Sequence, residues 1–178
     1  IVEIEAYHFQ AYEGNYTQRR NAGLALGTIL DPRGLPDLVK VAREDKQDIP
    51  PSFAALMIGK FRDPEALPVL REMIRSGRKS HRQRSSVLSV AKFPDLQAAY
   101  DILTWVIREE RSTVRDAAIF CLGFFRKQAL VPGGEGVAEP CRILKAMYVS
   151  SDENERRGAM LALALLGLLL RAHFPDVA

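Results

Sequence analysis

Hydrophobic and polar positions along this chain repeat at a regular interval. Residues 53–74, FAALMIGKFRDPEALPVLREMI, have the apolar spacing of two amphipathic helices joined by a tight turn. Nearly the same pattern occurs at 21–42 and again at 85–106, and the starts of the three copies differ by one interval, 53 − 21 = 85 − 53 = 32. A helical unit repeated in this way predicts a stack in which neighbouring units share one core.

A small residue recurs at one position of the first helix in each repeat. The residues at this position are Gly27, Gly59, Ala91 and Gly123. Because a missing or short side chain lets another helix come close, we expect the paired helix of the same repeat to cross here.

Asp-Pro pairs separate the two helices of the first two repeats. They are Asp31-Pro32 and Asp63-Pro64. An Asp side chain can cap a helix, and Pro is tolerated at the first helical position because its missing N–H would have no partner there. The second helix of each of these repeats is therefore expected to begin at the proline.

The start of the chain does not fit the repeat. Ile1, Ile4, His8 and Tyr12 would share one helical face, although alternating apolar residues would also allow a short strand. We favour a helix that caps the array or remains from an earlier repeat.

The end of the array also departs from the pattern. The interval from Gly123 to its equivalent Ala164 is 164 − 123 = 41, so the fourth repeat is longer than the others by 41 − 32 = 9. This insertion falls within 127–139. The last helix is apolar on nearly all sides from 159 to 170. Such a surface needs a cover, and we expect a longer array, a homodimer through this helix, or a segment of the chain folded back over it.

These patterns predict an all-α fold in a single domain over 1–178. The expected architecture is a right-handed α-α superhelix, or solenoid, of stacked antiparallel helix pairs with about four to five repeats. The expected segments are 1–16 as a cap or partial repeat, 17–46, 47–78, 79–110 and 111–150 as repeats, and 151–178 as a partial repeat with a tail.

The chain resembles HEAT-type repeats, and most of all the short repeats of phycobilisome-lyase-like HEAT proteins. The resemblance covers roughly residues 17–170, and the motifs that carry it are Ala25-Leu26-Gly27 with Asp31-Pro32, residues 56–59 with Asp63-Pro64, and Cys121-Leu122-Gly123. It implies a superhelical scaffold that binds proteins along its concave face. A minority of HEAT-like proteins bind nucleic acid or act as enzymes.

Composition narrows the function only slightly. Hydrophobic residues make up 47% of the chain, which is enough for a core, and the net charge of +3 permits an acidic partner without requiring one. The longest uncharged run, at 158–170, is shorter than the roughly 20 residues needed to span a membrane. We expect no membrane span, and a cytoplasmic location because no leader is visible.

The sequence contains no catalytic constellation that we can identify. Among His8, His81 and His173, only His8 has a Glu or His at helical spacing, which is Glu5, and no phosphate-binding or nucleophile motif occurs. Cys121 is interpreted as a buried structural thiol, and Cys141, near a helix start, as a structural thiol with a reactive role as the alternative. We expect no cofactor and no metal. A non-enzymatic role is favoured, with a lyase-like or DNA-glycosylase-like protein as an alternative based on resemblance alone.

Two surfaces are candidates for binding. The first is the concave face lined by the second helices, with the residues Lys40, Arg71, Glu72, Met73, Arg75, Asp101, Trp105 and Arg108. A large aromatic residue in such a face is a typical binding hot spot. The alternative is that Val41, Met73 and Trp105 pack between repeats.

The second candidate is a basic patch at 75–84, with the residues Arg75, Arg78, Lys79, His81, Arg82 and Arg84. It could bind phosphates, nucleic acid or an acidic peptide, or it could be an ordinary helix end with a solvated turn. Arginines recur early in first helices at 20, 84, 115 and 157, and we interpret them as ion pairs between neighbouring repeats. The favoured function is a scaffold for a protein or peptide partner, with nucleic-acid binding through the patch as the alternative.

Overall fold

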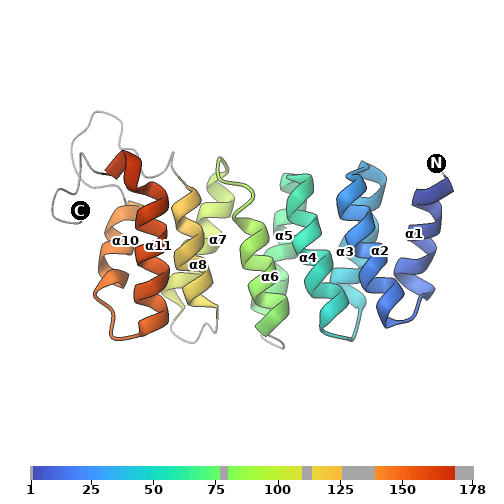
Figure 1. Ribbon diagram of the computed structural model, residues 1–178, viewed down its shortest axis with the longest axis horizontal. Helices are drawn as coiled ribbons and strands as arrows, with labels where there is room; N and C mark the ends of the chain where they lie inside the picture. Colours follow the sequence, from blue (N-terminus) through green and yellow to red (C-terminus); the bar gives the residue numbers. More distant parts are fainter. Residues whose placement is uncertain (1, 77–79, 110–113, 126–138, 171–178) are drawn as a thin grey trace. The chain divides into compact units, whose positions relative to one another are not determined.

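The computed structural model describes residues 2–76, 80–109, 114–125 and 139–170, and this part of the chain contains helices and no strand (Figure 1). The α-helices are α1 (Val2–Glu13), α2 (Tyr16–Ile29), α3 (Leu35–Glu44), α4 (Ile49–Phe61), α5 (Leu67–Arg75), α6 (Ser80–Val90), α7 (Gln97–Arg108), α8 (Arg115–Cys121), α10 (Glu139–Tyr148) and α11 (Glu153–Leu170). The short 3-10 helices are η1 (Pro32–Gly34), η2 (Pro64–Ala66) and η3 (Leu122–Phe124). The all-α prediction is confirmed.

The chain divides into two compact units. Unit 1 is Ile1–Phe93 and contains α1 to α6, and unit 2 is Pro94–Ala178 and contains α7 to α11. The boundary falls between the two helices of the predicted third repeat, 79–110. The expectation of one continuous domain stays a prediction.

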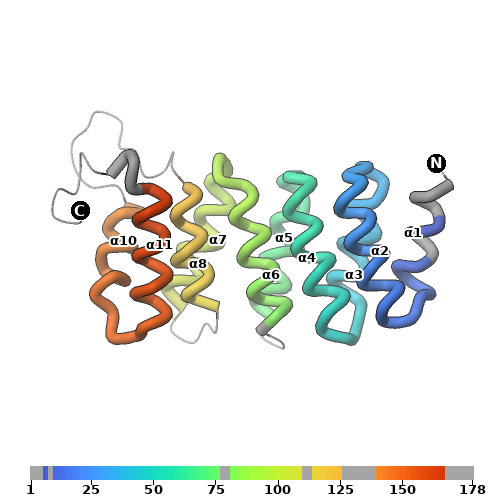
Figure 2. Tube along the Cα trace, viewed as in Figure 1, coloured from blue at the N-terminus to red at the C-terminus, as the bar shows by residue number. Residues whose placement is uncertain are grey.

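In unit 1 the helices form two rows (Figures 1 and 2). The first row is α2, α4 and α6, with α4 packed against both of the others, and the second row is α1, α3 and α5, with α3 packed against both of the others. Helix α1 therefore takes the place of a second helix from an earlier repeat, and the helical interpretation of the chain start is confirmed for Val2–Glu13.

Each second-row helix packs most extensively against the first-row helix that follows it. In unit 1, α3 packs on α4 and α5 on α6, more closely than either packs on the helix before it. Unit 2 has two rows of its own: α8 and α11 are its first-row helices and contact each other, and its second-row helices α7 and α10 pack on α8 and α11 respectively. The hairpin at 53–74 holds the two predicted helices, α4 and α5, but α5 finds its main partner in α6.

Consecutive first-row helices approach closely at the small residues. A Cβ added to Gly59 would lie 2.9 Å from the Cα of Ser89 on α6, and one added to Gly123 would lie 2.8 Å from the Cα of Ala162 on α11. A Cβ added to Gly27 would overlap the Met57 side chain of α4. The expected close approach is confirmed, but the neighbour is the next first-row helix and not the paired helix of the same repeat.

The Asp-Pro turns are capped as expected. The Asp31 carboxylate accepts a hydrogen bond from the Arg33 backbone N–H, and the Asp63 carboxylate accepts one from the Glu65 N–H, both at 3.0 Å. Each aspartate begins a 3-10 turn, η1 or η2, so the α-helices start three residues after the prolines, at Leu35 and Leu67.

The residues just before these aspartates have left-handed backbones. Leu30 has φ of 57° and Arg62 has φ of 53°. This conformation costs a non-glycine residue about 1–2 kcal/mol. The left-handed residue ends α2 in one case and α4 in the other, and it lets the chain change direction within one residue. The Arg33 guanidinium bonded to Asp31 lowers the pKa of that carboxyl from 3.8 to about 2, so any stability from this exposed pair is complete above the unfolded pKa and is lost as the pH falls from 3.8 through about 2.

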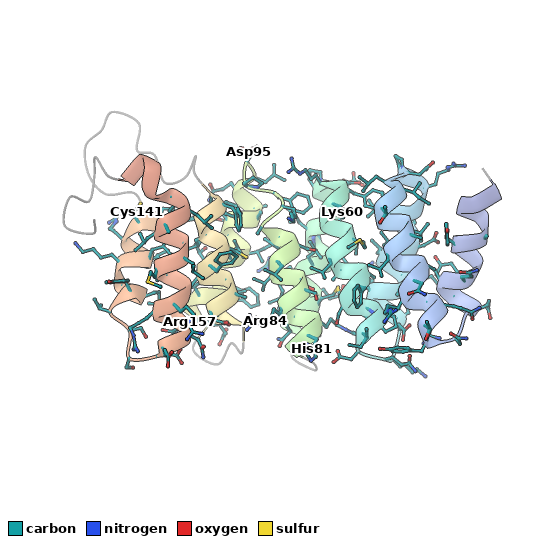
Figure 3. All side chains as sticks on the ribbon, viewed as in Figure 1. Lys60, His81, Arg84, Asp95, Cys141 and Arg157 are labelled. Carbon is teal, nitrogen blue, oxygen red and sulfur yellow. The ribbon has the colours of Figure 1, made fainter. Side chains whose placement is uncertain are left out.

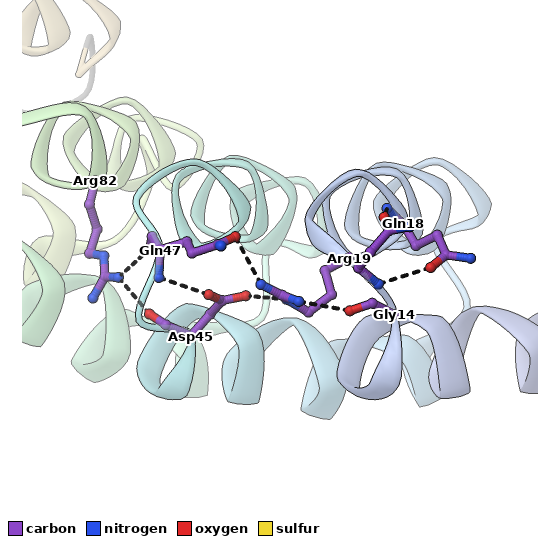
Figure 4. Close-up of polar contacts among 7 residues, drawn as sticks. Gly14, Gln18, Arg19, Asp45, Gln47 and Arg82 are labelled. Carbon is purple, nitrogen blue, oxygen red and sulfur yellow. Dashed lines mark hydrogen bonds and ion pairs between the residues drawn. The ribbon is translucent and has the colours of Figure 1, made fainter.

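An arginine network ties the turn between α3 and α4 to the first row (Figure 4). The Arg19 Nε of α2 donates to Asp45 Oδ2 at 2.7 Å, and its Nη2 donates to Gln47 Oε1 at 2.9 Å. From the other side, the Arg82 Nη2 of α6 donates to the backbone carbonyls of Asp45 and Gln47 at 2.9 and 3.1 Å. The turn is therefore held by both α2 and α6, the two first-row helices on either side of α4.

We predict opposite stability changes for two glycine-to-alanine substitutions in unit 1. Gly59→Ala should lower the free energy of unfolding by about 1–3 kcal/mol, because the new Cβ meets the Ser89 backbone, which cannot move aside. Gly23→Ala should raise it by about 0.5–1 kcal/mol, because its Cβ meets only Leu38 Cδ2 at 3.7 Å and alanine favours the helix. Denaturant unfolding measures both, and stabilisation by Gly59→Ala would contradict the close approach.

We predict that Asp45→Asn lowers the free energy of unfolding by about 1–3 kcal/mol, because it leaves the Arg19 guanidinium without its carboxylate where both side chains are largely buried. The control is Glu72→Gln, which removes the Arg43–Glu72 pair at a surface where the side chains are 47% and 62% exposed. It should cost less than about 0.5 kcal/mol. Equal losses in the free energy of unfolding for the two variants would show that the Arg19–Asp45 contact does not stabilise the turn more than an exposed ion pair stabilises its helices.

Candidate functional site

The outer side of the second row in unit 1 carries charged residues on two neighbouring helices. The buried stripes of α3 and α5 contain Leu38, Ala42, Leu70 and Ile74, which face the core. The opposite stripes are exposed, and we call them the α3–α5 face, which consists of Lys40, Arg43, Glu44, Arg71, Glu72 and Arg75. The helical periods of α3 and α5 thus separate the residues that stabilise the stack from those that face solvent.

Contacts fix part of this face. The Arg43 Nε of α3 and the Glu72 Oε2 of α5 form an ion pair at 3.1 Å that joins the two helices. The Lys40 Nζ lies 4.0 Å from the centroid of the Tyr12 ring of α1. The Tyr12 hydroxyl donates a hydrogen bond to Asp37, and burial together with the charge of Glu44 raises the pKa of Tyr12. Lys40 is therefore positioned by an aromatic ring that is itself held in place.

Met73 does not lie on this face. Its side chain is 3% exposed, and that of Val41 is 4% exposed, so both pack in the core as the alternative interpretation proposed. The assignment of Met73 to the binding surface is corrected. The reason is that α5 packs against α6 and also against α3, so its buried stripe is wider than the stripe of a helix with one neighbour.

The remaining predicted residues of the concave face lie in unit 2, on α7. Asp101 and Arg108 are exposed and Trp105 is half-buried. The Arg108 Nη2 forms an ion pair with Glu139 Oε1 of α10 at 2.6 Å, and Asp101 accepts a hydrogen bond from Gln97 Nε2 at 2.8 Å. The expectation that these residues form one surface with Lys40, Arg71 and Arg75 stays a prediction.

The basic patch at 75–84 is only partly described. Arg78 and Lys79 lie outside the described residues, while Arg75, His81 and Arg84 are exposed. His81 and Arg84 lie in the first half of α6 (Figure 3). Arg82 is partly buried and donates to the carbonyls of the α3–α4 turn, so its side chain supports the fold.

The arginines predicted to pair between repeats have different partners. Arg115 of α8 forms the expected pair with Glu155 of α11, at 3.2 Å. Arg157 pairs within its own helix with Glu153 at 2.7 Å, and the Arg20 guanidinium lies over the Phe53 ring at 5.9 Å. Sequence reasoning missed Arg19, whose partners are up to 28 residues away in a turn that the repeat pattern does not describe.

The cysteines have the character of structural thiols. Cys121 and Cys141 are both buried, and burial raises the pKa of the Cys141 thiol. A raised pKa disfavours the thiolate that a nucleophile needs, so the structural interpretation is the better one for Cys141. Within the described part of the chain, no group of three or more His, Cys, Asp or Glu side chains is placed to hold a metal ion.

No described helix has both the length and the apolar composition required to cross a membrane. Among curated proteins, no sequence matches this chain. Residues 10–91, which include α2 to α6, match the family model for HEAT repeats, and this match does not distinguish the phycobilisome-lyase-like subtype. The stacked helix pairs and the capped Asp-Pro turns of unit 1 lie within the same residues, and residues 10–91 are therefore identified as HEAT repeats.

Proposed function

We propose that this protein is a non-enzymatic interaction scaffold that binds a protein or peptide partner through the exposed side of its second-row helices. HEAT repeats commonly serve as scaffolds for protein interactions. The observation that carries the proposal is the difference between α4 and α5, the two helices of the central hairpin of unit 1. Helix α4 has a single exposed residue, Lys60, whereas the shorter α5 has four, which are Pro68, Arg71, Glu72 and Arg75.

A face built in this way suits recognition. Its side chains stand on helices that the core holds in place, so the backbone of the face loses little conformational freedom when a partner binds. The Arg43–Glu72 pair contributes little stability at its exposure, and it holds two long side chains in one arrangement. Half-buried Trp105, with Asp101 and Arg108, gives unit 2 a related set of groups on α7.

We predict that Arg71→Glu/Arg75→Glu reduces capture of the physiological partner at least about tenfold, because it reverses the charge of the α3–α5 face. The matched control is Lys60→Glu/Arg62→Glu, which makes the same change in net charge at exposed residues of the first row and its turn. Proteins captured from a cell extract by the wild-type chain and by each variant are quantified by mass spectrometry. Capture that survives the first double substitution, or is lost equally with both, would contradict the proposal.

A homodimer through α11 is a separate proposal. On this helix the side chains of Met160, Leu161 and Leu165 are 52%, 46% and 36% exposed. Apolar side chains grouped in this way favour association. We expect a solution mass of two chains, reduced to one by Met160→Glu/Leu161→Glu, and a wild-type mass of one chain in light scattering would contradict it.

A further inference from the structure

We propose that the α3–α5 face recognises an acidic segment of a protein partner, with carboxylates at alternate positions of an extended peptide. This inference rests on the proposed scaffold function and adds the chemistry of the partner. It uses the charge of the face, the spacing of its arginines and the two glutamates that lie between the basic groups.

The positive charge of the chain is concentrated in unit 1. Residues 1–93 contain 15 Lys and Arg against 11 Asp and Glu, a net charge of +4, and residues 94–178 contain 10 against 11, a net charge of −1. The α3–α5 face has four basic residues, Lys40, Arg43, Arg71 and Arg75, and two acidic ones. It therefore attracts a negatively charged segment and repels a positively charged one.

The spacing on α5 matches an extended peptide. Arg71 and Arg75 are one helical turn apart, which is about 6 Å along the axis. In an extended chain, side chains on the same side recur every second residue, about 6.6 Å apart. Two carboxylates at alternate peptide positions can therefore each reach one arginine and accept a bidentate pair of hydrogen bonds.

The neighbouring helix offers a third contact. Lys40 stands on α3, which packs beside α5 at the usual distance between helix axes of about 8–10 Å. Its ammonium is held over the Tyr12 ring, and Arg43 is held by Glu72. A peptide that crosses from α5 to α3 would place a further carboxylate at Lys40.

The mixed charges favour a peptide over nucleic acid. Glu44 and Glu72 stand among the basic residues of the face. A nucleic acid carries a phosphate at every nucleotide and would bring some of them against these carboxylates. A peptide can place neutral residues opposite the glutamates.

The test is fluorescence anisotropy on the full chain with labelled peptides of defined sequence. The probes are a peptide of alternating Ser and Glu, a peptide of the same composition with its Glu residues in one block, a peptide of alternating Ser and Gln, and a short oligothymidine. We expect the alternating Ser-Glu peptide to bind most tightly and the Ser-Gln peptide not to bind. Higher salt should weaken the binding because the contacts are exposed.

Matched variants locate the binding. Lys40→Gln/Arg71→Gln/Arg75→Gln should weaken the alternating Ser-Glu peptide at least about tenfold. The control Lys60→Gln/Arg62→Gln/Lys92→Gln removes the same charge from exposed residues elsewhere in unit 1 and should change binding by less than about twofold. Thermal unfolding checks that each variant folds, and Arg75→Gln alone, at one exposed residue, should give a smaller loss in the same direction.

Three results would overturn the inference. The first is that the alternating Ser-Glu peptide does not bind. The second is that both triple variants lose the same affinity for this peptide. The third is that the oligothymidine binds more tightly than the peptide and that its binding depends on Arg71 and Arg75. Each is distinct from failure of the scaffold function. If partner capture still depends on Arg71 and Arg75 while the acidic peptide does not bind, the scaffold function stands and only the partner chemistry is wrong.

Discussion

The close approach of consecutive first-row helices is the constraint on which the rest of the structure depends. At Gly59 and Gly123 the next helix brings its backbone to a position that any side chain would occupy. At the first of these contacts the buried Ser89 hydroxyl donates to the Ala55 carbonyl, so the small polar residue is satisfied where water is excluded. With the first row spaced by these contacts, each second-row helix packs against the following first-row helix and exposes its other side.

This arrangement separates the residues of unit 1 by task. Apolar stripes and small residues hold the rows together, and largely buried Arg19 and Asp45 secure a turn. Exposed charges on α3 and α5, such as the Arg43–Glu72 pair, contribute little to folding. We assign binding to α3 and α5 because their exposed stripes are charged, whereas the neighbouring α4 has only Lys60 exposed to solvent.

The fold was largely predictable because its causes are local and periodic. The regular recurrence of Leu, Gly and Asp identifies the helices and the caps at Asp31 and Asp63 without knowledge of distant contacts. The same recurrence does not say which neighbour Gly59 faces, because both a paired helix and a following helix recur with the same period. The 3-10 turns that begin at the prolines were missed for another reason, since Asp-Pro suits the start of either kind of helix.

The site was less predictable because it depends on contacts that are not periodic. Arg19 bonds to Asp45, 26 residues away, and Arg82 bonds to the backbone of the same turn. The pattern of hydrophobic positions predicts neither contact, because both are made by polar groups. Met73 was misplaced because a helical wheel does not show that α5 is covered by neighbours on two sides. Of the insertion at 127–139, only Glu139 lies within the described residues, and it forms the ion pair with Arg108.

The central claim is that the first row holds the stack together while the second row of unit 1 binds the partner. Amide chemical-shift mapping of the isotope-labelled chain, titrated with the alternating Ser-Glu peptide, tests it most directly. We predict that the largest shift changes lie in α3 and α5, around Lys40, Arg71 and Arg75, with small changes in α2 and α4. Changes centred on α2 or α4, or spread evenly over the basic residues of the chain, would contradict it.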